Sequence, residues 1–168
     1  IISPEVGFMY AKRLIALKAI VIPWGFLHSR VIDFLPKNLP QDVMVLVKRN
    51  NNRIMENWNG LKKICEKYCK EFNLKLYIHD DSNMPNVENQ LKAFNSAKIV
   101  IGSHGAGFIN LLGCQSNTFL IECKYMDRKL SRFYPKVVHG EEGDWFFRLS
   151  RHLNIHYQTR QLSQHFYP

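Results

Sequence analysis

The chain has 168 residues, enough for one domain with a buried core, and its hydrophobic (46%) and charged (22%) contents are ordinary for a globular protein. Lysine and arginine outnumber aspartate and glutamate by 23 to 14, so the net charge is +9. This charge favours anionic partners such as nucleotides, nucleic acid, sugar phosphates or a membrane surface, with a simple role in solubility as the alternative. No stretch has the roughly 18 uncharged apolar residues of a membrane span, which excludes a transmembrane helix.

Cysteine content and the start of the chain bear on its origin. Four cysteines in a chain of this length do not make a disulfide framework, and no asparagine begins an Asn-x-Ser/Thr acceptor. We therefore expect a cytoplasmic protein, with the lumen of the endoplasmic reticulum or Golgi as the alternative if the chain is an excised domain. Because the first residue is Ile1, we expect a piece of a longer protein.

The first 41 residues carry weaker patterns than the rest. These are a helix near residues 6–17, a strand at residues 19–22 and a proline-bounded piece at residues 31–35. Pro36 and Pro40 make a natural junction behind them. We therefore predict an amino-terminal extension over residues 1–41 and a main unit over residues 42–168.

Strand and helix patterns alternate through the main unit. Strands are predicted at residues 42–47, 74–78, 98–101, 118–121 and 155–157. A first helix is predicted at residues 55–72, and a second has Pro85 in its first turn and runs through Phe94. A third helix runs from the glycines after residue 101 through Leu112, and a fourth from Asp144, its N-cap, to His152. This alternation predicts an α/β fold with a doubly wound, mostly parallel, Rossmann-like sheet. Ligands of such sheets bind outside the carboxyl ends of the strands. Those ends are residues 48–53, 79–81, 102–107 and 122–124.

A glycine-rich turn joins the third strand to an apolar helical pattern. Its small residues Ser103, Gly105, Ala106 and Gly107 would leave backbone N–H groups and the positive end of a helix directed at one point, which suits a phosphate. The turn lacks the lysine of a Walker A loop and the third glycine of a dinucleotide fingerprint, which disfavours ATP hydrolysis and nicotinamide chemistry. A tight turn without a ligand is the alternative.

Two further residues belong to this turn. His104 is a candidate catalytic residue because an imidazole can bind a phosphate or sugar hydroxyl and can act as a general acid or base. Its alternative is a histidine whose ring is satisfied by the backbone. Asn110, one helical turn later, is a candidate binding residue.

Two arginines and a glutamate lie at the other strand ends. Arg49 and Arg53 follow the first strand, and their planar guanidinium groups match diphosphate oxygens; Lys48 is a weaker candidate, and a solvated basic loop is the alternative. Glu122 closes the fourth strand, where its carboxylate can accept both ribose hydroxyls or pair with Arg128.

Three other features are open to more than one interpretation. Residues 79–81 are interpreted as a polar turn, with a metal site as the lesser option. Cys65 and Cys69 are four residues apart on a predicted helix, and we expect core packing rather than metal binding there. The basic and aromatic residues of the 124–143 loop would suit single-stranded nucleic acid, which makes a non-catalytic basic binding module the alternative function.

The glycine turn resembles the hallmark segment of glycosyltransferase family 61, which includes plant xylosyltransferases and animal enzymes that add O-linked N-acetylglucosamine. The segment reads His104-Gly105-Ala106-Gly107-Phe108-Ile109-Asn110. Further similar pieces end at Arg49 and Glu122 and run over residues 145–157, so the resemblance covers roughly residues 42–158.

The resemblance implies an inverting transferase that uses a uridine diphosphate sugar, with this chain as the donor-binding lobe of a two-lobed, GT-B type fold. Residues 1–41 would be a remnant of the acceptor lobe. By position, Arg49 and Arg53 would face the diphosphate, the glycine turn and Asn110 would line the donor pocket, and Glu122 would hold the ribose. We expect no cofactor and no metal, because the arginines can neutralise the diphosphate, and we expect a glycan or glycoprotein as acceptor.

Overall fold

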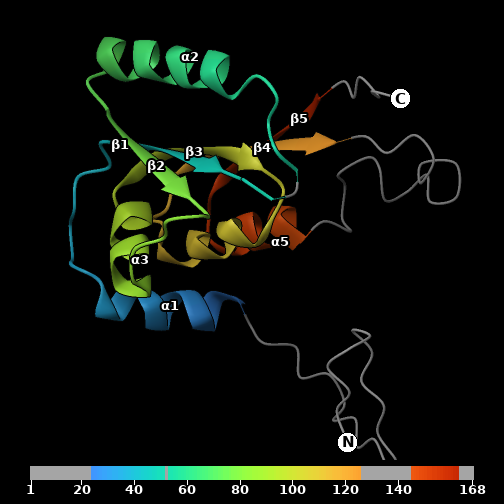
Figure 1. Ribbon diagram of the computed structural model, residues 1–168. Coiled ribbons are helices and arrows are strands. Elements are labelled where there is room, and N and C mark those ends of the chain that lie inside the picture. Colours follow the sequence, from blue (N-terminus) through green and yellow to red (C-terminus); the bar gives the residue numbers. More distant parts are fainter. Residues whose placement is uncertain (1–23, 52, 126–144, 163–168) are drawn as a thin grey trace, which may run out of the picture.

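The apolar runs of the sequence form a parallel sheet. The computed structural model describes residues 24–51, 53–125 and 145–162 (Figure 1). In chain order the elements are α1 (Trp24–Phe34), β1 (Val43–Lys48), α2 (Trp58–Glu71), β2 (Lys75–Asp80), α3 (Val87–Asn95), β3 (Ala97–Ser103), the 3₁₀ helix η1 (Ala106–Gly113), β4 (Phe119–Tyr125), α5 (Trp145–His152) and β5 (His156–Leu162). No helix among them is long and apolar enough to cross a membrane.

The five strands lie in the order β2-β1-β3-β4-β5, and all four neighbouring pairs are parallel. From β1 the chain passes outward to β2 and then returns to the other side of β1 to form β3. The winding direction therefore reverses between β1 and β3, which confirms the doubly wound α/β prediction. In such sheets this reversal opens a crevice at the carboxyl ends of the two strands, where ligands bind.

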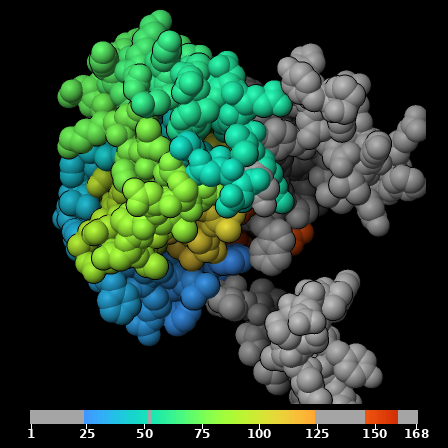
Figure 2. Space-filling view, in the orientation of Figure 1, coloured from blue at the N-terminus to red at the C-terminus, as the bar shows by residue number. Residues whose placement is uncertain are grey.

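Helices cover both faces of the sheet. α2 lies on one face, and α1, α3, η1 and α5 lie on the other (Figure 1). In the space-filling view α2 forms the upper part of the described surface and α1, in blue, the lower part (Figure 2). The larger buried cluster includes Val45, Val47, Phe94, Val100, Phe108, Leu111, Leu120 and Leu149, and the smaller one beneath α2 consists of Met44, Leu46, Cys65 and Cys69. Cys65 and Cys69 are both buried, which confirms the predicted core packing at these positions.

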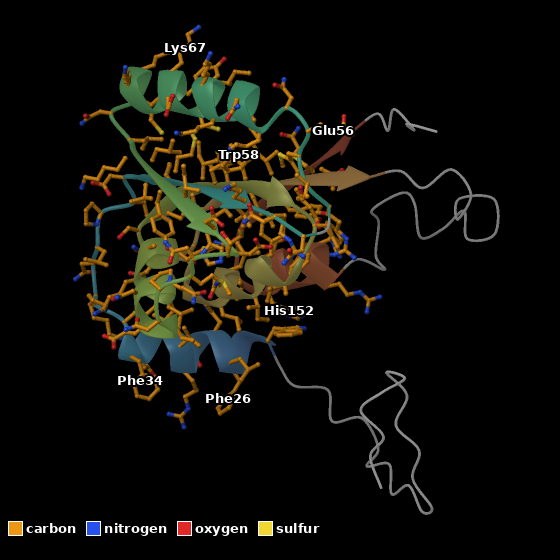
Figure 3. The ribbon with its side chains drawn as sticks, viewed as in Figure 1. Phe26, Phe34, Glu56, Trp58, Lys67 and His152 are labelled. Carbon is orange, nitrogen blue, oxygen red and sulfur yellow. The ribbon has the colours of Figure 1, made fainter. Side chains whose placement is uncertain are left out.

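The proline-bounded piece before the main unit is part of a longer helix, α1. Its residue His28 donates through Nε2 to the carbonyl oxygen of Cys114 at 2.9 Å, so α1 packs on the segment that follows η1. Phe26 and Phe34 lie on its outer side (Figure 3) and are 55% and 87% exposed. The helix and strand predicted at residues 6–22 lie outside the described residues, and the division at residue 41 stays a prediction.

Side-chain caps set the starts of two helices. α2 begins three residues later than predicted because Asn57 caps it, its Oδ1 accepting from Gly60 N at 3.2 Å. α3 begins after Asn86, whose Oδ1 accepts from Asn89 N at 2.9 Å. Pro85 therefore precedes the cap, and its predicted place in the first helical turn is wrong.

Several other elements differ from their predicted extent. The segment after the glycine turn is a 3₁₀ helix rather than an α-helix, with i→i+3 bonds such as Phe108 N to Gly105 O at 3.1 Å. β4 continues to Tyr125, so Glu122 lies inside this strand rather than at its end. β2 continues to Asp80, so His79 lies within a strand instead of after it. The predicted polar turn at residues 79–81 is therefore wrong for its first two residues. Asp144, the predicted N-cap of α5, lies outside the described residues.

Candidate functional site

At the switch point, where a crevice is expected in such sheets, β1 and β3 approach each other closely. Val47 and Gly102 are register partners near the carboxyl ends of the strands. A Cβ atom at Gly102 would lie 2.6 Å from Val47 Cβ, so no larger residue fits without displacing β1. The residues that follow each strand, beginning with Arg49 and His104, therefore start close together.

The Arg49 side chain lies against the glycine turn and is only 14% exposed. Its Nε is 3.3 Å from Asp81 Oδ2, and Asp81 Oδ1 in turn accepts from the backbone N–H of Asn50 at 3.0 Å. A Cβ atom at Gly105 would lie 2.2 Å from Arg49 Nη1. The absence of a side chain at Gly105 thus lets the guanidinium rest on the turn, while Asp81 orients it.

Arg53 reaches the same turn from farther along the chain. Its Nη1 donates to the carbonyl oxygen of His104 at 3.2 Å, and its backbone has a left-handed φ of 54°. Arg53 is exposed, so its guanidinium can contact both the turn and a ligand in solvent. The structure therefore brings both sequence-predicted arginines to the glycine turn.

The imidazole of His104 is held by a buried carboxylate. His104 Nδ1 lies 2.5 Å from Oε1 of Glu122, which is fully buried, and the hydroxyl of Tyr157 donates to Glu122 Oε2 at 2.5 Å. The ring of Phe146, on α5, packs edge-on against His104 with centroids 5.1 Å apart. A ribose contact of the kind expected for Glu122 would require this carboxylate to leave both partners and the core. The geometry instead favours a role for Glu122 in holding His104.

The remaining predicted residues of the turn differ in exposure. Ala106 is exposed and Gly107 half-buried, so their backbone groups lie near the surface. Asn110 is 7% exposed, and its amide donates to Gln90 Oε1 at 3.1 Å and to Gly107 O at 3.2 Å. Asn110 thus stabilises the turn from the buried side, by linking it to Gln90 of α3. Ser103 is buried at the end of β3, and its hydroxyl has no hydrogen-bond partner in the described part of the chain.

The neighbouring end of β2 carries acidic groups that bind the basic residues after β1. Lys48 Nζ lies 2.8 Å from Asp80 Oδ2, so its charge is already paired. The hydrogen bonds from Lys48 and Ser82 hold the pKa of Asp80 well below its usual range. Among residues 24–51, 53–125 and 145–162, no three His, Cys, Asp or Glu side chains are grouped to hold a metal ion.

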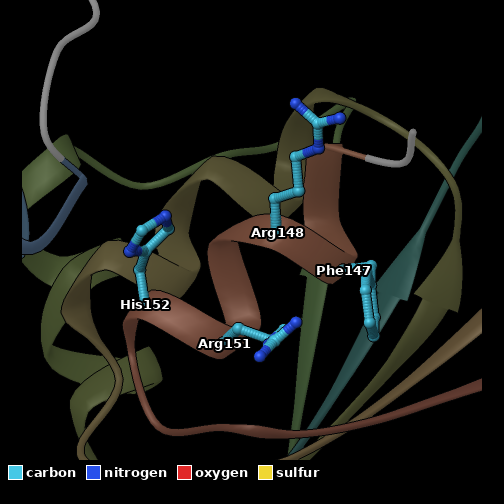
Figure 4. A pocket seen from close by; sticks show the side chains of 4 residues that line it. All are labelled: Phe147, Arg148, Arg151 and His152. Atoms are coloured by element: carbon cyan, nitrogen blue, oxygen red, sulfur yellow. The ribbon is translucent and has the colours of Figure 1, made fainter. Parts of the chain in front are cut away.

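A hollow that the sequence interpretation did not single out lies on α5. It has a volume of about 490 Å³, and the described residues that line it are Phe147, Arg148, Arg151 and His152 (Figure 4). The guanidinium carbon of Arg151 lies 6.0 Å from the centroid of the Phe147 ring. Three basic residues within five positions of one helix were the signal in the sequence that could have indicated this basic surface.

Comparison with known families identifies the chain. The family model described as Glycosyltransferase 61 matches residues 6–121. The chain belongs to this glycosyltransferase family. No curated protein matches the sequence. The matched region contains β1, β3, both arginines and the whole glycine turn, and it ends one residue before Glu122.

Family membership confirms that this glycosyltransferase 61 chain is a transferase, which acts on a sugar donor and an acceptor. It favours the enzyme over the alternative of a non-catalytic basic module. The basic and aromatic loop on which that alternative depended falls largely at residues 126–144, outside the described residues.

Proposed function

We propose that the chain is the donor-binding lobe of an inverting, two-lobed glycosyltransferase of the GT-B type. Its donor is a uridine diphosphate sugar, with xylose or N-acetylglucosamine as the sugar, and its acceptor is a hydroxyl of a glycan or a protein. The observation that carries the proposal is the convergence of Arg49 and Arg53 on the glycine turn at the β1/β3 crevice. Two guanidinium groups beside backbone N–H groups form a site for a diphosphate.

The arginines supply the charge that the reaction requires. The sugar leaves a diphosphate on which negative charge grows in the transition state, and preorganised cations stabilise that charge without reorganising. Arg49 is preorganised by Asp81 at 3.3 Å, and Arg53 by the His104 carbonyl at 3.2 Å. With these two groups in place the proposed mechanism requires no metal ion.

His104 takes the proton of the acceptor in this mechanism. The acceptor oxygen attacks the anomeric carbon from the face opposite the diphosphate, which inverts its configuration. A carbon–oxygen bond to the acceptor forms while the bond to the diphosphate oxygen breaks, and the electron pair leaves with the nucleoside diphosphate. The acceptor proton passes to Nε2 of His104, whose other nitrogen is bonded to Glu122.

Thermal unfolding in the presence of nucleoside diphosphates tests the proposal. A ligand at a hundred times its dissociation constant adds about 2.7 kcal/mol to the free energy of unfolding, which is easily seen as a raised midpoint. We expect uridine diphosphate and its sugars to raise the midpoint, and adenosine diphosphate at equal concentration to raise it much less. Equal shifts with both nucleotides, or a shift that vanishes at moderate salt, would favour non-specific anion binding instead.

A further inference from the structure

Glu122 is a fully buried carboxylate beside the glycine turn. It lies on β4, between the glycine turn and β5, and its two oxygens face two different donors. A buried carboxylate is stable only when hydrogen bonds replace its lost hydration. The His104 ring and the Tyr157 hydroxyl, each 2.5 Å away, provide such bonds.

The chemistry of the three groups decides which atom carries the proton in each of the two hydrogen bonds to Glu122. Burial and the hydrogen bond to Glu122 raise the pKa of Tyr157, so its hydroxyl keeps its proton and donates to Oε2. A carboxylate that already accepts from Tyr157 accepts equally from His104, which places a proton on Nδ1. In the neutral ring Nε2 of His104 then carries the lone pair, and it makes no hydrogen bond with a described residue.

We propose that Tyr157 and Glu122 are positioning residues that hold His104 with Nδ1 protonated and Nε2 available to the reacting atoms. The catalytic part of this proposal rests on the proposed function, in which His104 accepts the proton of the acceptor. Tyr157 fixes the carboxylate, the carboxylate fixes the ring, and neither residue touches the substrate. A carboxylate on Nδ1 also stabilises the positive charge that appears on the ring when Nε2 takes a proton.

The surroundings of the ring support this arrangement. Phe146 packs edge-on against one side of His104 and adds no charge. Among the described residues, Arg53 binds the His104 carbonyl, and Arg49, paired with Asp81, rests on Gly105. Because both arginines are cations that suit the diphosphate, neither can receive the acceptor proton, which leaves that role to Nε2 of His104.

The first test reads the tautomer of His104 directly. Two-dimensional proton–nitrogen NMR of the imidazole side chains, assigned with a His104→Gln variant, shows which ring nitrogen carries the proton. We expect Nδ1 of His104 to be protonated in the unmodified chain, whereas a free imidazole prefers a proton on Nε2. Glu122→Gln removes the charge and should shift the ring toward the Nε2-protonated form. An Nε2-protonated ring in the unmodified chain, or an unchanged ring in Glu122→Gln, would overturn the proposal.

The second test separates positioning from folding with Tyr157→Phe, which keeps the buried ring and removes the hydroxyl. We expect the rate of sugar transfer to fall about tenfold with KM for the donor changed less than about twofold, and the acid limb of the pH–rate profile to move. Tyr77→Phe is the matched control, because Tyr77 lies partly buried on β2, away from Glu122, and it should retain the unmodified rate. An unchanged rate and pH profile in Tyr157→Phe would overturn the positioning role.

Failure of the two proposals can be told apart. The tautomer is read without donor or acceptor, so it tests the Tyr157–Glu122–His104 arrangement alone. Binding of uridine diphosphate tests the donor site alone. A protonated Nδ1 in a chain that binds no nucleotide would contradict the proposed function and leave the positioning pair intact.

Discussion

The guanidinium of Arg49 occupies the space that a side chain at Gly105 would fill. A Cβ atom there would lie 2.2 Å from Nη1 and 3.0 Å from Cζ of the arginine. The two residues are 56 positions apart, and each follows a strand beside the point where the sheet reverses its winding. The absence of a side chain at Gly105 thus has a physical role, which is to admit an arginine to the surface of the turn.

Gly105→Ala tests this relationship. The added methyl group would push the guanidinium away from the turn, and the displaced atoms are the far end of a flexible side chain. We therefore expect the affinity for uridine diphosphate to fall about tenfold while the free energy of unfolding without ligand changes by less than about 1 kcal/mol. Isothermal titration and urea denaturation measure the two quantities.

Gly25→Ala is the control for this substitution. Nothing lies within 4 Å of a Cβ atom at Gly25, which is exposed on α1. We expect this variant to bind the nucleotide normally and to be more stable by up to about 1 kcal/mol, because alanine favours a helix over glycine. Normal nucleotide affinity in Gly105→Ala would contradict the role of Arg49 at the turn.

Gly102→Ala should act on stability instead. Here the added Cβ atom would lie 2.6 Å from Val47 Cβ and 3.3 Å from Val47 O, which are parts of a buried central strand with no freedom to move aside. We expect a loss of about 1–3 kcal/mol in the free energy of unfolding, measured by urea denaturation without ligand. A stability equal to that of the unmodified chain would mean that β1 and β3 are farther apart than the structure has them.

His79 should make the stability of the fold depend on pH. It is 1% exposed, its ring packs edge-on against Phe94 at 5.4 Å, and neither ring nitrogen has a hydrogen-bond partner in the described part of the chain. Burial lowers the pKa of His79, although Asp81 and Asp80 oppose this effect. The unfolded chain therefore binds a proton more readily than the folded chain below a pH of about 6.5, the usual pKa of histidine.

It follows that this contribution to stability is complete above pH 6.5 and is lost as the pH falls toward the lowered pKa of the folded state. His79→Leu removes the titrating group and its two buried nitrogens. We expect it to be neutral or stabilising by up to about 1 kcal/mol at pH 7.5, and to lose less stability than the unmodified chain between pH 7 and 5. Urea denaturation at each pH measures this, and an identical pH dependence in the two proteins would refute it.

The central part of the fold could be predicted because its strands are buried on both sides. The apolar runs that became β1, β3 and β4 have no other stable place than the interior of a parallel sheet. β5 was predicted too short, because its continuation through Gln158, Thr159 and Arg160 is polar and an edge strand tolerates polar residues. α1 was not recognised as a helix, since it has no fully buried residue and therefore a weak apolar pattern.

The candidate site was predictable in its composition and less so in its geometry. The position of strand ends was enough to bring Arg49, Arg53 and His104 together, because parallel strands share one carboxyl edge. The environment of Glu122 could not be predicted, because its partners His104 and Tyr157 lie 18 and 35 residues away and the pairing depends on the register of three strands. The bracing role of Asn110 likewise depends on Gln90 of α3, which no local pattern indicates.

The measurement that tests the account most directly is titration of uridine diphosphate into the chain and into Arg49→Ala and Arg53→Ala. Arg30→Ala, at an exposed arginine on α1, is the matched control for loss of one positive charge. We expect each crevice variant to weaken binding about tenfold or more and the Arg30 variant to change it less than about twofold. Equal affinity in all four proteins would contradict a diphosphate site at the β1/β3 crevice.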